Sequence, residues 1–281
     1  MGESNQANRT LVRVLIVLLV LLGISRSAWP NADKDRKNAV KNLAKEIEQA
    51  QFHKVYVPDF LDPSGGRTEK GCFFASTFST NLAKDASNFE IVNRIQAQKK
   101  LNELHISAQD FQKPEVMSKA AQAVGADAFL IGTAAISAKE AKLSLSLRDA
   151  ASDKEVRSSD YHEKLEPQFE GNFPAVEDTD SHILYFPGLD GVSQPKCKYC
   201  PSPDYTDEER RKRVSGSVMM SVSLDEKGTI RNVRVVTNPD EGLTRKAVNI
   251  LQKWRMEPSY DPDGRAVPVR VMIETMFRLL G

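Results

Sequence analysis

The chain has 281 residues, of which 40% are hydrophobic and 27% are charged. Lys and Arg number 39 and Asp and Glu number 38, so the net charge is +1. This balance produces no strong field of the kind that attracts nucleic acid or an acidic substrate, and we expect no nucleic-acid partner. The length is sufficient for two modest domains with extensions.

The first thirty residues contain a short apolar run. Arg9 and Arg13 precede it, and it continues without a charge from residue 14 to residue 24. It is shorter than the ~20 residues of a usual spanning helix and closer to a signal-peptide core. Residues 1–30 are predicted to be a cleaved signal peptide or a membrane anchor over residues 11–27. In both cases the basic residues keep the N-terminus in the cytoplasm and the rest is exported.

Strands and helices alternate through the middle of the chain. Apolar residues at helical spacing predict an amphipathic helix over residues 31–51. The further predicted elements are a strand at 54–60, a turn-rich loop at 62–66, a helix at 73–83, a strand at 89–92, helices at 95–103 and 115–124, a strand at 125–133, and strands at 143–147 and 156–162. This order predicts an α/β layer domain over residues 31–165.

This middle part shows no pattern typical of a catalytic or metal site. The four histidines of the chain lie far apart, without metal-ligand spacing. Asp59 and Asp62 are interpreted as turn and solvation residues. The sequence Gly65-Gly66-Arg67-Thr68 only loosely matches a phosphate-binding loop, so an ordinary loop before a helix is favoured. We expect no enzyme activity, no cofactor and no metal.

Three segments of the middle domain resemble the amino-terminal α/β domain of TolB and the related CsgG-like and FlgO-like envelope domains. They are Val55–Phe60 with the following Asp62–Gly65, then Gly125–Gly132, and then Leu147–Ala150. The resemblance extends over residues 35 to 163. It implies that this domain binds partner proteins or assembles with them, and that it is not a catalyst.

Residues 166–200 lack periodicity and contain several prolines, which predicts an extended linker. Cys197 and Cys200 lie near its end. A structural disulfide is the plain expectation in an oxidising compartment, and free or metal-binding thiols or a redox-active pair are the alternatives. Pro195 and Pro201 leave no helix to begin at the pair, unlike a thioredoxin-type site. Cys72 is expected to be an ordinary buried thiol.

The last eighty residues, 201–281, form the most regular part of the sequence. Thr206 and Glu209 are typical of a capping box for a short first helix. The elements predicted after it are an alternating strand at 216–224, a turn at 225–228, a strand at 229–236, a helix from Leu243 through Trp254 that Pro258 ends, and a long alternating strand at 267–279. The result is an α+β module with a helix over one sheet face.

The motifs of this module resemble the C-terminal domain of the TonB family. In order, they are Pro203 with Tyr205, Gly216 with Val218, Asp225 with Gly228, Trp254–Pro258, and Asp263-Gly264 with Val267–Val269. Met256 stands where phenylalanine is more usual. The predicted protein is therefore a two-domain α/β and α+β chain with an apolar N-terminal helix and a proline-rich linker.

The resemblance implies that this module binds a partner by pairing a strand edge. In the TonB family the partner is a segment of an outer-membrane β-barrel receptor, and an inner-membrane motor driven by protons supplies energy. The candidate partner-binding residues lie on the last strand and near the start of the module: Arg270, Met272, Glu274, Met276, Arg278 and Tyr205. The alternative is a solvated strand face whose edge is covered by a second copy in a homodimer, or by nothing.

The sequence departs from the family pattern in two ways, and both concern energy coupling and not partner binding. Energy-transducing members carry a polar Ser and His in the anchor helix, and residues 11–24 contain neither. The usual spacer of Pro-Lys and Pro-Glu repeats is replaced by a globular domain. We therefore expect a periplasmic TonB-like protein that binds an outer-membrane receptor or another envelope partner, with energy transduction left open. The alternative is an envelope scaffold or assembly factor without energy coupling.

Overall fold

The computed structural model describes residues 17–19, 30–137, 139–165, 183–203, 211, 215–237 and 239–277. The chain divides into two compact units. We call Leu22–Gln194 with Tyr260–Val267 the N-terminal unit, and Met1–Leu21, Pro195–Ser259 and Pro268–Gly281 the C-terminal unit.

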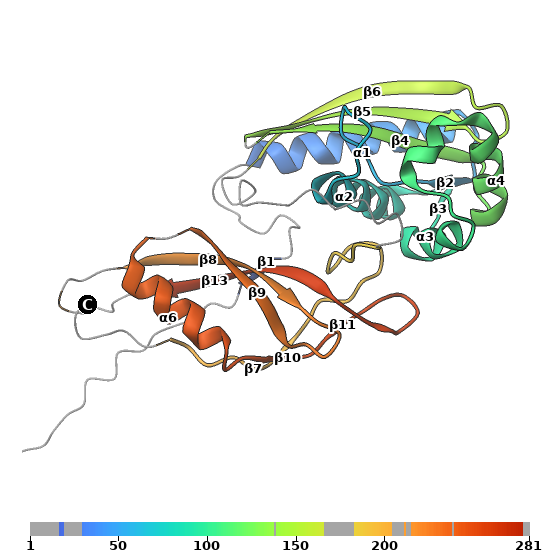
Figure 1. The fold of residues 1–281 in the computed structure, drawn as a ribbon. Coiled ribbons are helices and arrows are strands. Elements are labelled where there is room, and N and C mark those ends of the chain that lie inside the picture. Colours follow the sequence, from blue (N-terminus) through green and yellow to red (C-terminus); the bar gives the residue numbers. More distant parts are fainter. Residues whose placement is uncertain are drawn as a thin grey trace, which may run out of the picture. The chain divides into compact units, whose positions relative to one another are not determined.

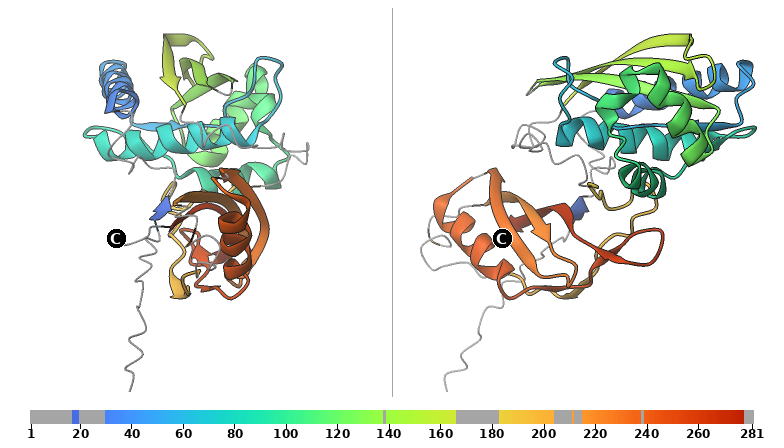
Figure 2. Two further views of the ribbon diagram at one scale, coloured as in Figure 1. Left: turned by 90° about the vertical axis from the view of Figure 1, so that its left-hand side faces the viewer. Right: turned by 45° about the vertical axis from the view of Figure 1, so that its right-hand side comes forward.

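The N-terminal unit is a five-stranded sheet with helices on both faces (Figures 1 and 2). Its elements are α1 (Pro30–Gln49), β2 (Lys54–Tyr56), α2 (Glu69–Asp85), β3 (Glu90–Ile91), α3 (Arg94–Glu103), the 3-10 helix η1 (Ala108–Gln112), α4 (Pro114–Val124), β4 (Ala128–Ile136), β5 (Glu140–Asp149) and β6 (Glu155–Lys164). The strand order is β3-β2-β4-β5-β6, with β2 parallel to both neighbours and β4, β5 and β6 antiparallel. This confirms the predicted α/β layer architecture.

Local chemistry explains where these helices begin and end. In α1, Val40, Leu43 and Ile47 recur on one face and are buried. The side chain of Thr68 caps α2 by accepting a hydrogen bond from the Gly71 amide. Gly125 closes α4 with φ 71°, a left-handed conformation in which a side chain would be strained.

Strand β2 is shorter than predicted, because it ends at Tyr56 and not near Phe60. Pro58 has no backbone N–H and cannot continue a ladder between two neighbouring strands. The segment after Tyr56 is nevertheless buried, and Phe60 is fully enclosed. The apolar residues of this segment correctly predicted its burial, but they did not show that its pairing with the neighbouring strands ends at Tyr56.

Residues 183–194 lie in the region interpreted above as linker, and the structure packs them into the N-terminal unit. Phe186, Leu189 and Val192 are buried. The Phe186 ring meets the edge of the Phe73 ring at a centroid distance of 5.5 Å. Asp190 is also buried, and its ion pair with Arg94 is described below. This segment is therefore part of the unit's core.

The C-terminal unit is built on a four-stranded antiparallel sheet of order β1-β13-β8-β9 (Figure 1). Its elements are β1 (Val17–Leu19), β7 (Cys197–Tyr199), β8 (Gly216–Leu224), β9 (Ile230–Thr237), α6 (Glu241–Leu251), β10 (Arg255–Met256) and β13 (Val269–Phe277). Strand β11 (Ser259–Tyr260) crosses the boundary between the two units in the sequence, and β12 (Ala266–Val267) belongs to the N-terminal unit. Strands β11 and β12 pair with each other, and the turn between them belongs to the N-terminal unit.

The predicted alternation of β8 and β13 is confirmed. Register places Val222 opposite Val271 and Met220 opposite Ile273, and these side chains are buried on the face that α6 covers. The turn between β8 and β9 requires Gly228, which has φ 73°. A Cβ atom there would lie 2.3 Å from the carbonyl oxygen of Met256.

The predicted end of the second helix is wrong. Helix α6 ends at Leu251, well before Pro258, and Arg255–Met256 form strand β10. Strand β10 pairs with β7, and the Trp254 indole N–H donates to the Pro201 carbonyl oxygen at 3.0 Å. Residues 197–201 thus supply hydrogen-bond partners for residues 254–256, in place of the bonds of a continued helix. The helical spacing of the apolar residues could not reveal these partners.

The apolar N-terminal run contributes a strand to the described structure. Val17–Leu19 form β1, which pairs with β13. Among the described residues, the structure contains no helix both long and apolar enough to cross a membrane. The predicted helix that includes Thr206 and Glu209 lies outside the described residues, as do Tyr205 and Arg278.

Candidate partner-binding edge

Without β1, the outer strands of the main sheet of the C-terminal unit are β9 and β13, and both pair with β8. The regularity of these two pairings differs. Along β9 the pairing with β8 shifts register twice, and Asn232 has φ 39°. Bulges and left-handed residues of this kind discourage strand addition. Strand β13 pairs with β8 through nine consecutive residue pairs without a shift. Because its backbone is regular, β13 is better suited than β9 to pair with an added strand.

The four described candidate residues of β13 lie on the sheet face opposite α6. Arg270 and Met272 stand opposite Ser223 and Ser221 of β8. Glu274 and Met276 stand opposite Met219 and Ser217 of the same strand. Met272 is buried, and the other three are half-buried. The structure thus brings these four residues together on one face.

Strand β1 shows what the β13 edge can accommodate. It runs antiparallel to β13, with Val17 opposite Glu274 and Leu19 opposite Met272. An extended segment of the chain therefore occupies three positions of the edge without disturbing the register of β13 with β8. Main-chain pairing of this kind is the basis of peptide recognition by strand addition.

Cys197 and Cys200 form a disulfide in a different part of the unit. Cys197 lies on β7 opposite Met256 of β10, and Cys200 Sγ is 3.6 Å from Met256 Sδ. Tyr199, between the two cysteines, is 60% exposed. The disulfide therefore lies where the chain enters the unit and borders the strand after α6. Cys72 is a buried free thiol, as expected.

The N-terminal unit contains a buried ionic cluster of Asp59, Arg67, Arg94 and Asp190. Arg67 Nε donates to Asp59 Oδ2 at 2.6 Å, and Arg94 Nη2 donates to the other oxygen of Asp59. Arg94 also pairs with Asp190, at 3.2 Å between Nε and Oδ2. The interpretation of Asp59 as a solvation residue is therefore wrong, whereas Asp62 is a turn residue that accepts from the amides of nearby Ser64 and Gly66.

The two carboxylates of this cluster respond differently to their surroundings. Burial opposes ionisation of Asp59, but Arg94 and Arg67 outweigh it and lower the pKa of this carboxyl from 3.8 to about 2. Burial raises the pKa of Asp190 above its ordinary value, although Arg94 acts against this. The difference follows from geometry, because Asp59 contacts two guanidinium groups and Asp190 contacts one.

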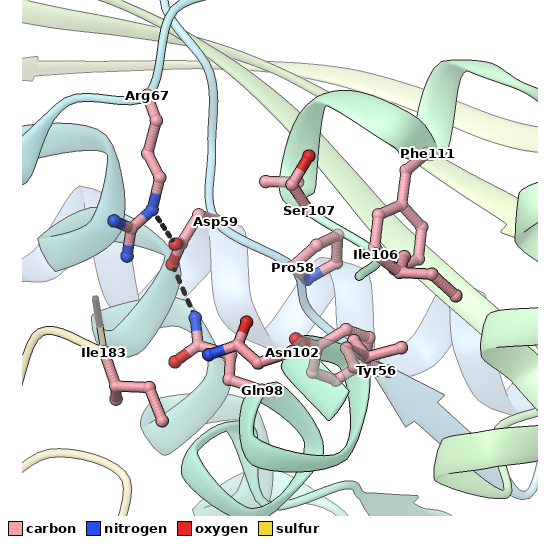
Figure 3. Close-up of a pocket in the computed structure, with 12 residues that line it drawn as sticks. Tyr56, Pro58, Asp59, Arg67, Gln98, Asn102, Ile106, Ser107, Phe111 and Ile183 are labelled. Carbon is pink, nitrogen blue, oxygen red and sulfur yellow. Dashed lines mark hydrogen bonds and ion pairs between the residues drawn. The ribbon is translucent and has the colours of Figure 1, made fainter. Parts of the chain in front are cut away.

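A small pocket adjoins the cluster (Figure 3). Asp59, Arg67 and Gln98 line one side, and Gln98 Nε2 donates to Asp59 Oδ1 at 3.1 Å. The volume is about 30 Å³, room for a few water molecules at most. Its charged groups bind each other, and no three potential metal-ligating side chains gather within the described ranges. The pocket is therefore too small to be our candidate site.

Sequence reasoning missed two features. Met219 of β8 lies opposite Glu274, and it was not among the residues proposed from the sequence to bind a partner. Pairing the predicted strands 216–224 and 267–279 as antiparallel neighbours would have suggested this face, although not the register. The contact of Arg94 with Asp190 joins residues 96 positions apart, and no local pattern signals it.

Comparison with known proteins places these observations in context. Residues 201–279 match the family described as the Gram-negative bacterial TonB protein C-terminal. The LpoB C-terminal domain from Salmonella enterica has 18% identity and a TM-score of 0.37, over 47% of this chain and 99% of that chain. The lipoprotein GNA1162 from Neisseria meningitidis has 16% identity and a TM-score of 0.32, over 40% and 80%.

A solved TonB domain is also similar to this chain. The Pseudomonas aeruginosa TonB CTD has 22% identity and a TM-score of 0.25, over 31% of this chain and 86% of that chain. No curated protein matches the sequence. The family match spans the motifs from Pro203 to Val269 on which the resemblance was based, and residues 201–279 of this chain therefore form a TonB C-terminal domain.

Proposed function

We propose that this chain is a periplasmic envelope protein whose TonB C-terminal domain binds a partner protein by adding one of its strands to the β13 edge. The observation that supports this proposal best is the unbroken pairing of β13 with β8 through nine consecutive residues, and the other edge of β13 pairs with the extended segment Val17–Leu19. In the exported protein of this proposal, that segment belongs to a leader that is cleaved or inserted in the membrane, which leaves the β13 edge to a partner strand. Strand β9 offers no comparable edge, because its pairing is bulged.

The proposed activity is binding and not catalysis. In the described part of the chain, the buried charges of Asp59, Arg67, Arg94 and Asp190 pair with one another, and the adjoining pocket has room for only a few water molecules. The N-terminal unit serves as a second protein-binding domain in this proposal. Export from the cytoplasm rests on the apolar run at 14–24 and its flanking arginines.

Photo-crosslinking in cells tests this proposal. A photoreactive amino acid at Met276 of β13 is expected to capture an envelope protein, whereas the same residue at Arg231 on the β9 edge is the matched control. Arg231 is well exposed, with 62% of its side-chain area accessible. Equal capture from both positions would contradict binding at the β13 edge. Fractionation of the cells gives the compartment independently.

The same experiment separates two functions of the bound state. An outer-membrane barrel captured from Met276, with capture changed when the proton gradient is collapsed, would support an energy transducer that works with an inner-membrane motor. Capture that is indifferent to the gradient would support an envelope scaffold or assembly factor. The absence of Ser and His from residues 11–24 and the globular N-terminal unit favour the scaffold.

A further inference from the structure

Glu274 is the one acidic residue of β13, and methionines surround it. Register places it opposite Met219 of β8, with Met272 and Met276 two positions away on the same face. Met219 and Met272 are each 9% exposed, and Glu274 is half-buried. Among the residues that the structure describes, Glu274 has no ion-pair partner. A half-buried carboxylate without a counter-charge loses hydration that a cation could replace.

A strand added to the β13 edge places one of its residues directly opposite Glu274. In the observed pairing Val17 stands directly opposite Glu274, and Leu19 stands opposite Met272. Residues directly opposite in an antiparallel pair have Cβ atoms about 5 Å apart, so the residue of a partner strand that stands opposite Glu274 would be within reach of its carboxylate. The segment that now occupies the edge is uncharged at this position, and the carboxylate remains without a counter-charge.

We infer that the β13 edge selects an antiparallel partner strand with a lysine or arginine opposite Glu274 and apolar residues opposite Met272 and Met276. The inference rests on the proposed function and specifies the partner. A long basic side chain suits this site, because its methylene groups pack on methionine while its charged head reaches the carboxylate. The partner sequence is then apolar, basic and apolar at every second position.

Peptide binding to the full-length chain tests this inference. Two short synthetic peptides carry leucines at the positions facing Met276 and Met272, and they differ only in lysine or glutamate at the position facing Glu274. Fluorescence anisotropy gives the two dissociation constants. An attractive cross-strand charge pair changes Kd about two- to fivefold, so exchanging attraction for repulsion should separate the peptides about five- to tenfold. The difference should shrink at high salt.

Variants of the chain show whether Glu274 causes the preference. In Glu274→Lys the preference should reverse, and in Glu274→Gln it should disappear, because the glutamine retains the shape without the charge. Arg231→Glu on the β9 edge is the matched control, and it should leave the preference unchanged. Circular dichroism confirms that each variant is folded before its binding is compared.

The outcomes separate the inference from the proposed function. Equal binding of both peptides to the native chain, or an unchanged preference in Glu274→Lys and Glu274→Gln, would overturn the inference while strand addition stands. Binding of neither peptide, together with no protection of β13 amides from hydrogen exchange, would overturn both. A lysine preference that reverses in Glu274→Lys and disappears in Glu274→Gln would support the inference.

Discussion

Replacing Asp59 and Asp190 separately by asparagine tests the electrostatics of the N-terminal unit. Both carboxylates contact Arg94, so each substitution removes one negative charge from the same buried guanidinium. The shapes of the side chains are nearly preserved, which limits cavity effects. The two variants therefore control for each other, and the difference between them reports the electrostatic environment of each carboxylate.

The expected magnitude for Asp59 follows from its pKa. Lowering of the pKa from 3.8 to about 2 corresponds to about 2 kcal/mol of the free energy of unfolding at pH 7. The folded pKa is below the unfolded one, so this contribution is present above about pH 4 and is lost as the pH falls towards 2. Asp59→Asn also leaves Arg67 and Arg94 with less compensation, so the total cost could reach about 5 kcal/mol.

Asp190 should behave in the opposite sense. Burial raises its folded pKa above the unfolded value, so ionisation of Asp190 opposes folding, and stability is regained as the pH falls through the folded pKa. Asp190→Asn should therefore destabilise the unit less than Asp59→Asn does at pH 7. Its amide oxygen can still accept a hydrogen bond from Arg94.

Urea unfolding at pH 7, and at steps down to pH 3, measures both effects. Far-UV circular dichroism follows the whole chain, and hydrogen exchange of the β2 and α3 amides reports the N-terminal unit. The native protein should lose stability as the pH falls below 4, and Asp59→Asn should show less of this loss. The reasoning would be refuted if Asp190→Asn cost as much as Asp59→Asn, or if Asp59→Asn cost under about 1 kcal/mol.

Three further predictions concern other contacts. Replacing Cys197 and Cys200 by serine should lower the free energy of unfolding of the C-terminal unit by about 2 kcal/mol, the loop-closure value for a four-residue ring, and thermal unfolding without reductant checks it. Lys99→Met should raise the pKa of Asp261, whose carboxylate accepts from Lys99 Nζ at 2.6 Å, and an NMR titration would detect an unchanged value as a contradiction. Gly228→Ala should cost more than about 1 kcal/mol, because alanine strains a residue at φ 73° and its Cβ meets the β10 backbone; a native-like melting temperature would disprove this.

The strands and turns of the C-terminal unit were predicted best from the sequence, because they depend on patterns among neighbouring residues. Val218, Met220 and Val222 alternate with small or polar residues, and a side-chain period of two specifies which face is buried. Gly228 marks a turn that needs a left-handed residue. In the N-terminal unit, α1 was readable for the same reason, since its buried residues recur at helical spacing.

Pairing between distant segments was decided by the tertiary structure alone. Helix α6 stops at Leu251 because β7 supplies a partner for the residues that follow. Asp59 became a buried ion-pair residue because α3 and the segment around Asp190 converge on it and on its partner Arg94. Neither the β7–β10 pairing nor the ion pairs of Arg94 produce a periodic pattern in the sequence.

The candidate edge combines both kinds of information. Alternation along residues 267–279 indicated from the sequence that Arg270, Met272, Glu274 and Met276 share a face. Only the folded structure supplied the register with β8, which places Met219 opposite Glu274, and the pairing of β1 with the other edge of β13. The physical reason is that a strand's own period determines its faces, whereas the choice of neighbour depends on main-chain hydrogen bonds available equally to every strand.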